Sequence, residues 1–529
     1  MKKHLVIFAG LAFSLSSCAS NKIEPPREKP LTFNPQGYTT GTITVEGKPI
    51  NYRAWENISY AANPVNTNHT AWQKMNIYVP EAAYNDSTAP ILLKNAVGGY
   101  MPSDPEKIDA LSREGRTGIM QAALAKGYVV VSPGARGRTS QEVYVPGNNP
   151  FSPPAEAGGP YIGKAPAAIV DLKAAVRYLR YNDALMPGSA EKIISDGTSA
   201  GGALSALLGG AGNNPLYEPY LKAIGAAPAR DDIFAVIAFC PITDLEHADM
   251  SYEWLYGGLN NIRKKSSLPP PGQPGGGNPR GSGRPDGSGA NQNALPGFND
   301  PEKALSAELA LLFPAYLDSL GLRRPDGKPL TAGSGADGTY IDYLSSFVIR
   351  SAQEAYNTSN EKDVFKAAFP WLKFDNANIA GLNFQEYLAY VMSRQPLKSV
   401  PAFDSMGVLD GAVSGENDVF GTRDIAALNF TEAGWQKNPV NTGTLPADIK
   451  DRVYLMNAMN FIGAADTDTA PNWYIRHGTI DRDTAFTVSV NLYTKLQNRG
   501  FTVDYKLAWE KPHSGDYDLD EVFAWIAKL

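Results

Sequence analysis

The 529-residue chain is poor in cysteine, in histidine and in net charge. Its two cysteines cannot form a disulfide framework. Lysine and arginine total 48 against 54 aspartates and glutamates, which gives a net charge of −6. With no basic excess to displace counterions from a polyanion, nucleic acid is not expected as a partner. The five histidines are too scattered to form a metal-ligand cluster, so we expect no metal and no other cofactor.

The apolar run near the N-terminus, residues 5–15, is too short to cross a bilayer. It follows two lysines and ends in L-S-S-C at residues 15–18. This ending resembles a bacterial lipobox, in which the cysteine becomes the lipidated first residue of the mature protein. The alternative is an ordinary signal peptide with a cysteine at that position by chance. The resemblance implies a lipoprotein signal peptide at residues 1–17 and lipidation at Cys18.

A lipid anchor at Cys18 would hold the protein in the bacterial cell envelope, either in the periplasm or at the surface. Several acyl chains on one cysteine make a stable anchor, because each buried CH₂ contributes roughly 0.8 kcal/mol. Residues 18–36 are expected to be a tether, since the stretch from 21 to 36 is polar and carries four prolines. The other cysteine, Cys240, lies in an apolar strand pattern and is expected to be a buried core thiol.

From about residue 37, short apolar runs alternate with segments of helical periodicity. This alternation indicates an α/β fold with a mostly parallel sheet and helices on both faces. Strands are expected at residues 91–93, 128–131, 192–195, 234–239, 473–476 and 502–509, and helices at 167–181, 451–461, 484–497 and 519–527.

The alternation stops for some two hundred residues in the middle of the chain. Residues 269–289 hold six prolines and eight glycines and no large apolar side chain, which predicts a flexible loop. Helices are expected at 301–320, with Asp300 as the cap, at 340–356 and at 384–394. The sequence therefore predicts a core of residues 37–246 and 450–529, interrupted by a large, mainly helical lid at 247–449.

A G-x-S-x-G motif at residues 197–201 lies between an expected strand and a helix rich in small residues. This is the nucleophile-elbow pattern, in which a tight turn lifts the serine hydroxyl to the N-terminal end of a helix. The pattern favours Ser199 as a nucleophile over a serine that only caps a helix. The oxyanion that forms on attack needs two preset donors. We expect them to be the N–H of Ala200 and backbone from Gly98 or Gly99.

A serine needs a base, and α/β-hydrolases place the triad in the order serine, acid, histidine. His513 follows the last expected strand and is the favoured base, with His477 as the alternative. Asp481 and Asp483 both follow the preceding strand. Asp481 is the favoured acid, because Asp483 opens the next expected helix and could serve as its cap.

The segments G-T-S-A-G-G at 197–202, R-H-G-T-I-D-R-D-T at 476–484 and P-H-S-G-D-Y-D at 512–518 resemble the bacterial tannase family. These tannin acyl hydrolases have an α/β-hydrolase fold, and the resemblance spans most of the chain from about residue 37. It implies Ser199, Asp481 and His513 as the catalytic triad.

The same resemblance implies three residues that bind the hydroxyls of a galloyl group. They are Asp483, and from the lid Lys398 and Glu416. Phenolic donors call for carboxylate acceptors, and a cation supports partial ionisation of a phenol. The segment between Lys398 and Glu416 is longer than is typical of the family, and the Gly/Pro tract is an addition to it.

The expected activity is therefore hydrolysis of galloyl esters, which are small aromatic esters. Three alternatives remain at this point: a feruloyl or other aromatic-acyl esterase, a lipoprotein that binds polyphenol or glycan without catalysis, and a serine peptidase. The last is disfavoured because the stretch before the sheet is too short for the large propeller that many such peptidases carry.

Overall fold

The computed structural model describes residues 31–65, 72–110, 117–145, 154–259, 263–264, 299–333, 338–409 and 413–529. The expected signal peptide, Cys18 and the Gly/Pro tract at 269–289 lie outside this part of the chain. Within it, no helix combines the length and the apolar character that crossing a bilayer requires.

A nine-stranded sheet forms the centre of the core, in the order β1-β2-β3-β5-β4-β8-β9-β14-β15. The six strands from β5 to β15 in this order are parallel, which confirms the predicted mostly parallel sheet. Their bounds are β4 Ile91–Lys94, β5 Val129–Pro133, β8 Ile193–Thr198, β9 Ala235–Phe239, β14 Asn472–Gly478 and β15 Thr502–Ala508.

Three antiparallel strands that the sequence analysis did not identify extend one edge of this sheet. They are β1 Thr39–Val45, β2 Lys48–Ser59 and β3 Lys74–Pro80. The turn between β1 and β2 consists of Glu46 and Gly47, both at positive φ, 50° and 77°. A two-residue turn with both residues at positive φ matches the twist of a hairpin, and the Glu46-Gly47 pair is the sequence signal for it.

Helices cover both faces of the sheet, and neighbouring strand residues point into different cores. Leu93 belongs to the larger hydrophobic cluster, whereas Leu92 belongs to a second cluster on the opposite face. The larger cluster includes the buried faces of α2 Ala167–Tyr181, α3 Ala200–Gly210 and α13 Phe486–Asn498. The second is closed by α1 Ile119–Ala125 and α14 Leu519–Ile526. A short helix, α4 Glu218–Ala223, packs beside α2.

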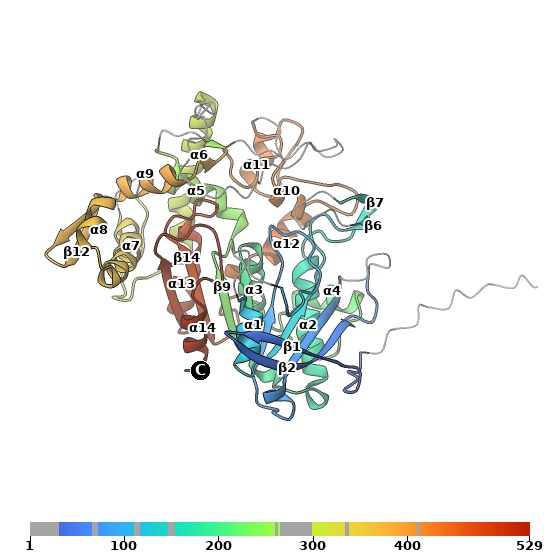
Figure 1. Cartoon of the computed structure of the whole chain (residues 1–529). Coiled ribbons are helices and arrows are strands. Elements are labelled where there is room, and N and C mark those ends of the chain that lie inside the picture. The colour runs from blue at the N-terminus through green and yellow to red at the C-terminus, as the bar shows by residue number, and fades with distance from the viewer. Residues whose placement is uncertain are drawn as a thin grey trace, which may run out of the picture.

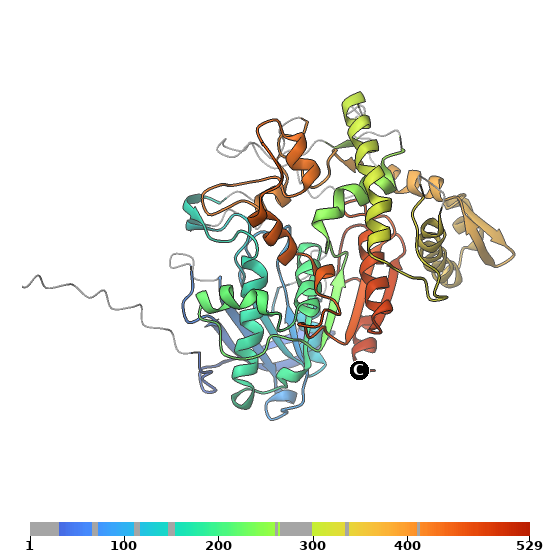
Figure 2. The ribbon, with the colours of Figure 1, turned by 180° about the vertical axis from the view of Figure 1, so that it is seen from behind.

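The insertion leaves the sheet after β9 and returns at β14, although these strands are direct neighbours. Because it starts where a parallel strand ends, it lies over the carboxyl edge of the sheet, as two opposite views show (Figures 1 and 2). Its helices are α5 Ala248–Tyr256, α6 Asp300–Ser319, α7 Thr339–Thr358, α8 Lys362–Ala368, α9 Phe384–Arg394, α10 Gly415–Val419 and α11 Glu432–Lys437. Two short strand pairs accompany them, β10 Arg263–Lys264 with β13 Leu397–Lys398, and β11 Leu372–Asp375 with β12 Asn378–Leu382.

The structure differs from two expected positions, the cap of α6 and the residue at which the insertion ends. The cap of α6 is Asn299 rather than Asp300, because Asn299 and Glu302 form a reciprocal capping box. The boundary at residue 450 falls inside α12 Ala447–Leu455. The lid therefore joins the core within a continuous helix.

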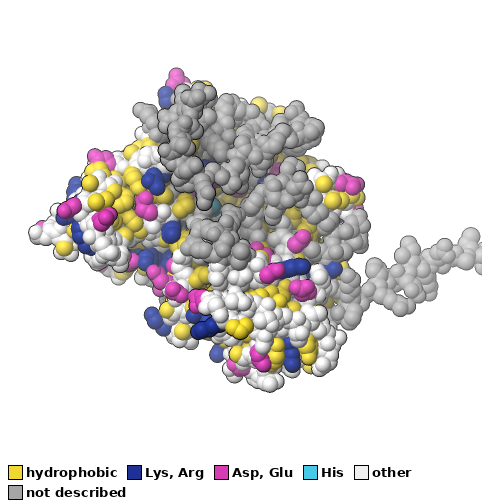
Figure 3. All heavy atoms as spheres, viewed as in Figure 1, with side chains coloured by type: hydrophobic (Ala, Val, Ile, Leu, Met, Phe, Trp, Pro, Cys, Tyr) yellow, Lys and Arg dark blue, Asp and Glu magenta, His cyan; other side chains and the backbone are white. Residues whose placement is uncertain are grey.

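The helices α7, α8 and α9 form a lobe at one side of the molecule (Figure 1), and α7 contacts β15. Aromatic rings fill its interior and continue to Trp509, which follows β15. The ring centroids of Phe369 and Trp509 are 4.8 Å apart, and those of Trp371 and Tyr387 are 5.0 Å apart. Hydrophobic side chains also show among charged ones on the surface of this lobe (Figure 3), and Val364 of α8 is 61% exposed.

The expected tether is too long at its C-terminal end. Phe33 is buried, and its ring lies 5.2 Å from Trp55 of β2. The Phe33 backbone N–H donates to Asn182 (2.8 Å), and the Trp55 indole donates to the carbonyl of Asn34 (3.0 Å). One aromatic residue in a polar, proline-rich stretch is enough to fasten it to the core, so the packed domain begins before residue 37.

Candidate active site

Ser199 stands in the turn between β8 and α3 in a strained backbone conformation, with φ 61° and ψ −122°. A non-glycine residue at positive φ is uncommon and concentrates at functional sites. The turn is possible because glycines flank it. A Cβ on Gly197 would lie 2.4 Å from the Gly201 carbonyl oxygen, and one on Gly202 would lie 2.6 Å from the Phe239 carbonyl oxygen.

Ser199, His513 and Asp481 form a continuous hydrogen-bonded chain. The Ser199 hydroxyl donates to His513 Nε2 over 2.7 Å, and His513 Nδ1 donates to Asp481 Oδ2 over 2.7 Å. Asp481 follows β14 and His513 follows β15, in the loops where the order of the motifs placed them. The structure thus brings together three residues that are far apart in the sequence.

The Asp481 carboxylate is completely buried but well supplied with donors. Its Oδ1 accepts the backbone N–H groups of Asp483 (2.8 Å) and Thr484 (3.3 Å). Burial alone would raise the pKa of Asp481, but the facing His513 and His477 outweigh it and lower the pKa to about 2. Asp481 therefore stays ionised at any pH at which the protein is expected to work.

The pKa of His513 is shifted in the opposite direction to that of Asp481. Burial disfavours its charged form, but the Asp481 carboxylate outweighs burial and raises the pKa of His513 well above its usual value. The neutral imidazole, which can accept the Ser199 proton, therefore forms only as the pH rises through this raised pKa.

The two candidate histidines lie on different sides of Asp481, and Cys240 lies next to one of them. His477 is fully buried and lies behind Asp481, with Nε2 at 3.3 Å from Oδ2, whereas His513 is the histidine bonded to Ser199. Cys240 is buried as expected, but its Sγ lies 4.0 Å from His513 Nε2. Cys240, Asp481 and His513 bring possible metal-ligating atoms within 4.8 Å of one another, but those of Asp481 and His513 are engaged in the hydrogen bonds above.

The loop with Gly98 and Gly99 packs directly against the start of α3. Asn95 donates to the Gly201 carbonyl over 3.0 Å, and a Cβ on Gly201 would lie 2.6 Å from the Val97 carbonyl oxygen. The Gly98 carbonyl closes the turn by accepting the N–H of Met101 (3.0 Å). Two successive positive φ angles, at Gly99 (56°) and Tyr100 (55°), turn the backbone at this point. The first turn of α3 begins at Ala200, where helix N–H groups have no partner within the helix.

The three expected phenol-binding residues come from separate elements. Asp483 is two residues from Asp481, partly exposed, and 3.1 Å from Arg482. Lys398 of β13 lies over the ring of Phe403, 3.9 Å from its centroid.

Tyr252 of the lid contacts the backbone of Lys398 and that of Arg482, the residue before Asp483. The Tyr252 hydroxyl donates to the Arg482 carbonyl (2.7 Å) and accepts the N–H of Lys398 (3.1 Å). Burial, and then the charge of Glu416 of α10, raise the pKa of Tyr100 in the loop that follows Gly98 and Gly99.

Two cations fasten the lid to the core next to Glu416. Arg138 pairs with Asp418 of α10 over 2.5 Å. The ammonium of Lys164 donates to three carbonyls, those of Arg138 (2.6 Å), Asp418 (2.8 Å) and Ala426 (2.7 Å). Burial lowers the pKa of Lys164 to about 8. These residues were not identified from the sequence, because each is an ordinary charged residue whose partner lies far away in the chain.

Another buried cation connects the loop of His513 to the strand of Ser199. Lys94, at the end of β4, contacts Asp196 of β8 over 2.6 Å and Asp516 over 3.2 Å. Burial would lower the pKa of Lys94, but the two carboxylates outweigh it and raise the pKa. Gly515 allows this close approach, since a Cβ there would collide with Thr198.

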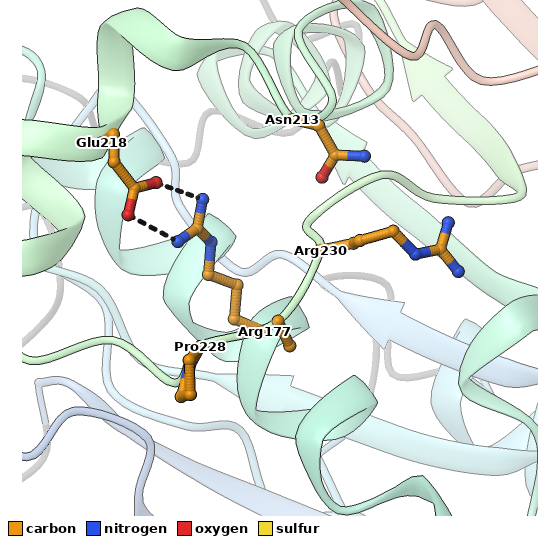
Figure 4. A pocket seen from close by; sticks show the side chains of 6 residues that line it. Arg177, Asn213, Glu218, Pro228 and Arg230 are labelled. Carbon is orange, nitrogen blue, oxygen red and sulfur yellow. Dashed lines mark hydrogen bonds and ion pairs between the residues drawn. The ribbon is translucent and has the colours of Figure 1, made fainter.

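A shallow polar cavity of about 560 Å³, wide open to the surface, lies elsewhere, between α2 and α4 (Figure 4). Asn213, one of its lining residues, follows the C-terminal end of α3, whereas Ser199 precedes the N-terminal end. Its two arginines are already paired, Arg177 with Glu218 and Arg230 with Glu191. The cavity is therefore separate from the hydrogen-bonded chain.

Comparisons with known proteins point to one family. The BD-FAE family model, an esterase domain, matches residues 162–268. A tannase from Fusobacterium nucleatum is 38% identical with a TM-score of 0.79, and the match covers 95% of this chain and 99% of that one. The chain belongs to the tannase family.

A tannin acyl hydrolase from Lactobacillus plantarum is 35% identical with a TM-score of 0.78, covering 94% of this chain and 98% of the other. A tannin acyl hydrolase solved with ethyl gallate is 34% identical, with a TM-score of 0.78 and coverage of 94% and 98%. A comparison with curated protein sequences finds no match. As a tannase-family member the chain is an α/β-hydrolase and an ester hydrolase, as the resemblance implied.

Substituting Lys94 with methionine should leave the buried carboxylate of Asp196 and the partly exposed one of Asp516 without a counter-charge. Breaking a buried pair in this way costs roughly 3–5 kcal/mol of the free energy of unfolding. Denaturant unfolding measures the loss. Lys303→Met is the matched control, because Lys303 and Asp300 form an exposed pair whose loss costs at most about 1 kcal/mol. Equal losses in the two variants would show that the Lys94 cluster does not stabilise the fold.

Proposed function

We propose that this tannase-family protein is a serine esterase that hydrolyses galloyl esters, both hydrolysable tannins and simple alkyl gallates. The observation that carries the proposal is the hydrogen-bonded chain from Asp481 through His513 to Ser199. The similarity to a tannin acyl hydrolase solved with ethyl gallate supports the choice of acyl group.

The reaction starts when Ser199 Oγ attacks the ester carbonyl and His513 Nε2 takes the serine proton. Asp481 keeps His513 in the correct tautomer and stabilises the imidazolium that forms. His513 then protonates the leaving alcohol, and a galloyl-enzyme remains. Water, activated by the same histidine, attacks this acyl-enzyme and releases gallate.

The negative charge on the tetrahedral oxygen is held by backbone donors. The N–H of Ala200 is one, at the start of α3, where the helix dipole favours negative charge. The second comes from Gly98 or Gly99, whose loop packs on that helix. Donors fixed in place before the reaction are worth roughly a hundred- to thousandfold in rate each.

Selection of the acyl group is assigned to three polar residues. Asp483 and Glu416 accept hydrogen bonds from phenolic hydroxyls, and Lys398 supplies a cation for a partly ionised phenol. The separate origins of these residues support the assignment, because Asp483 belongs to the core whereas α10 and β13 belong to the lid.

Ser199→Ala and His513→Ala should each lower kcat/KM for methyl gallate by at least roughly 10⁴-fold, because each removes the nucleophile or its base. Circular dichroism and thermal unfolding should stay close to the parent protein. A fluorophosphonate should label the parent at Ser199 and leave Ser199→Ala unlabelled. Absence of an adduct on the folded parent would instead favour a non-catalytic binding protein.

Asp483→Ala and Glu416→Ala should chiefly reduce the preference for the trihydroxylated ring, since each deletes an acceptor for a phenolic hydroxyl. The measurement is the ratio of kcat/KM for methyl gallate to that for methyl 4-hydroxybenzoate, which we expect to fall roughly tenfold or more. Exposed Glu308→Ala serves as the control. An unchanged ratio in Asp483→Ala would remove that residue from the acyl site, and faster turnover of methyl ferulate by the parent would replace gallate with ferulate.

We also propose that Cys18 carries a lipid anchor in the cell envelope. The support is the L-S-S-C ending of the N-terminal apolar run. In a bacterial host, the parent should sediment with membranes and Cys18→Ser should not, because the acyl chains are lost. Equal distribution of both chains between the membrane and soluble fractions would contradict the anchor.

A further inference from the structure

His477 occupies the position directly behind the proposed triad acid. It lies in β14 and its side chain has no solvent exposure. Its Nε2 is 3.3 Å from Asp481 Oδ2 and 3.2 Å from the Thr484 carbonyl oxygen. A carboxylate and a carbonyl are both acceptors, so this nitrogen must carry the proton.

The other ring nitrogen faces a hydroxyl. His477 Nδ1 lies 3.1 Å from Ser489 Oγ of α13, and Tyr505 of β15 lies 3.1 Å beyond that oxygen. Burial lowers the pKa of His477, against the pull of Asp481 in the other direction. We infer a neutral ring whose Nε2–H donates to the Thr484 carbonyl and lies close to Asp481 Oδ2. Its Nδ1 faces Ser489 Oγ, which also lies 2.9 Å from the Phe486 carbonyl oxygen.

Both oxygens of Asp481 are consequently restrained. Oδ1 accepts two backbone N–H groups, and Oδ2 accepts His513 at 2.7 Å and lies 3.3 Å from His477. A carboxylate restrained at both oxygens cannot rotate away from His513. The dipole of the His477 N–H also offsets part of the negative charge that attracts the proton of His513.

We propose that His477 is a positioning residue, which aims the Asp481 carboxylate at His513 and moderates its pull on the His513 proton. The inference rests on the proposed serine-esterase function. His477 does not touch Ser199 or the reacting atoms, so its effect passes through Asp481.

Several other titratable groups face this cluster. Tyr256 of α5 donates to the Asp481 carbonyl (3.2 Å) and Tyr387 of α9 donates to the Thr479 carbonyl (2.7 Å). Burial raises the pKa of both phenols, so they stay neutral. The remaining ionisable neighbours are Arg482, Cys240, Tyr505 and Tyr517.

The test compares two substitutions at the same position. His477→Phe removes the donor and keeps an aromatic ring, whereas His477→Gln keeps an N–H that can reach the carboxylate. In His477→Phe, we expect kcat for methyl gallate to fall roughly 10- to 100-fold, with KM changed less than about twofold. The acid limb of the kcat/KM profile should move up by about 0.5 pH unit or more, because an uncompensated Asp481 holds the His513 proton more tightly.

His477→Gln should restore the position of the acid limb and most of kcat. His247→Phe is the matched control, since His247 also binds a carboxylate, Asp244 at 2.7 Å, but outside the triad. His247→Phe should leave the pH of the acid limb unchanged. The proposal is overturned if folded His477→Phe keeps the parental limb, or if the glutamine variant behaves like the phenylalanine variant.

The pH dependence of fluorophosphonate labelling at Ser199 measures the position of the acid limb without a galloyl substrate. Failure of the substrate assignment is thereby separated from failure of the positioning role. Should His477→Phe not fold, ¹⁵N-histidine NMR of the parent decides. His477 should be the neutral Nε2–H tautomer between pH 6 and 9, and an imidazolium or an Nδ1–H tautomer would overturn the proposal.

Discussion

The short hydrogen bond between buried Asp481 and His513 is the interaction on which the rest of the site depends. A buried carboxylate is costly unless donors surround it, and Asp481 is held by two imidazoles and two backbone N–H groups. His477 comes from the end of β14 itself, and the other donors come from the two loops that follow β14 and β15. The sheet therefore determines the electrostatics of the site by setting where its last two strands end.

The conformation of Ser199 depends on close contact between backbones. Ser199 keeps its strained conformation because Gly197, Gly201 and Gly202 let a strand, a helix and two loops approach to distances that a Cβ would prevent. Lys94 adds a charged connection between the same strand and the loop of His513. Strain at the serine is thus balanced by contacts on several sides, as expected of a conformation that the surrounding structure imposes.

Much of this arrangement could be predicted from the sequence, because strand periodicity and the G-x-S-x-G motif are local signals. Ser199, Asp481 and His513 followed from the order of strands and loops, and α2 and α9 have the predicted bounds. The first three strands were missed. The burial of β1 and β2 is irregular, and their main signal is one Glu-Gly turn, whereas β3 is buried along almost its whole length. The role of Phe33 and the pairs of Lys94, Arg138 and Lys164 were also missed, because each depends on a partner distant in the sequence.

The attachment of α10 to the core has a consequence for substrate entry. With Arg138 paired to Asp418, and Lys164 bound to carbonyls of both the core and the lid, this side of the lid is ordered by contacts within the chain itself. The entropy of ordering it is lost when the chain folds and is not subtracted from binding energy at each turnover. A side of the lid that is fastened in this way cannot adapt its shape to a ligand as a loose segment could.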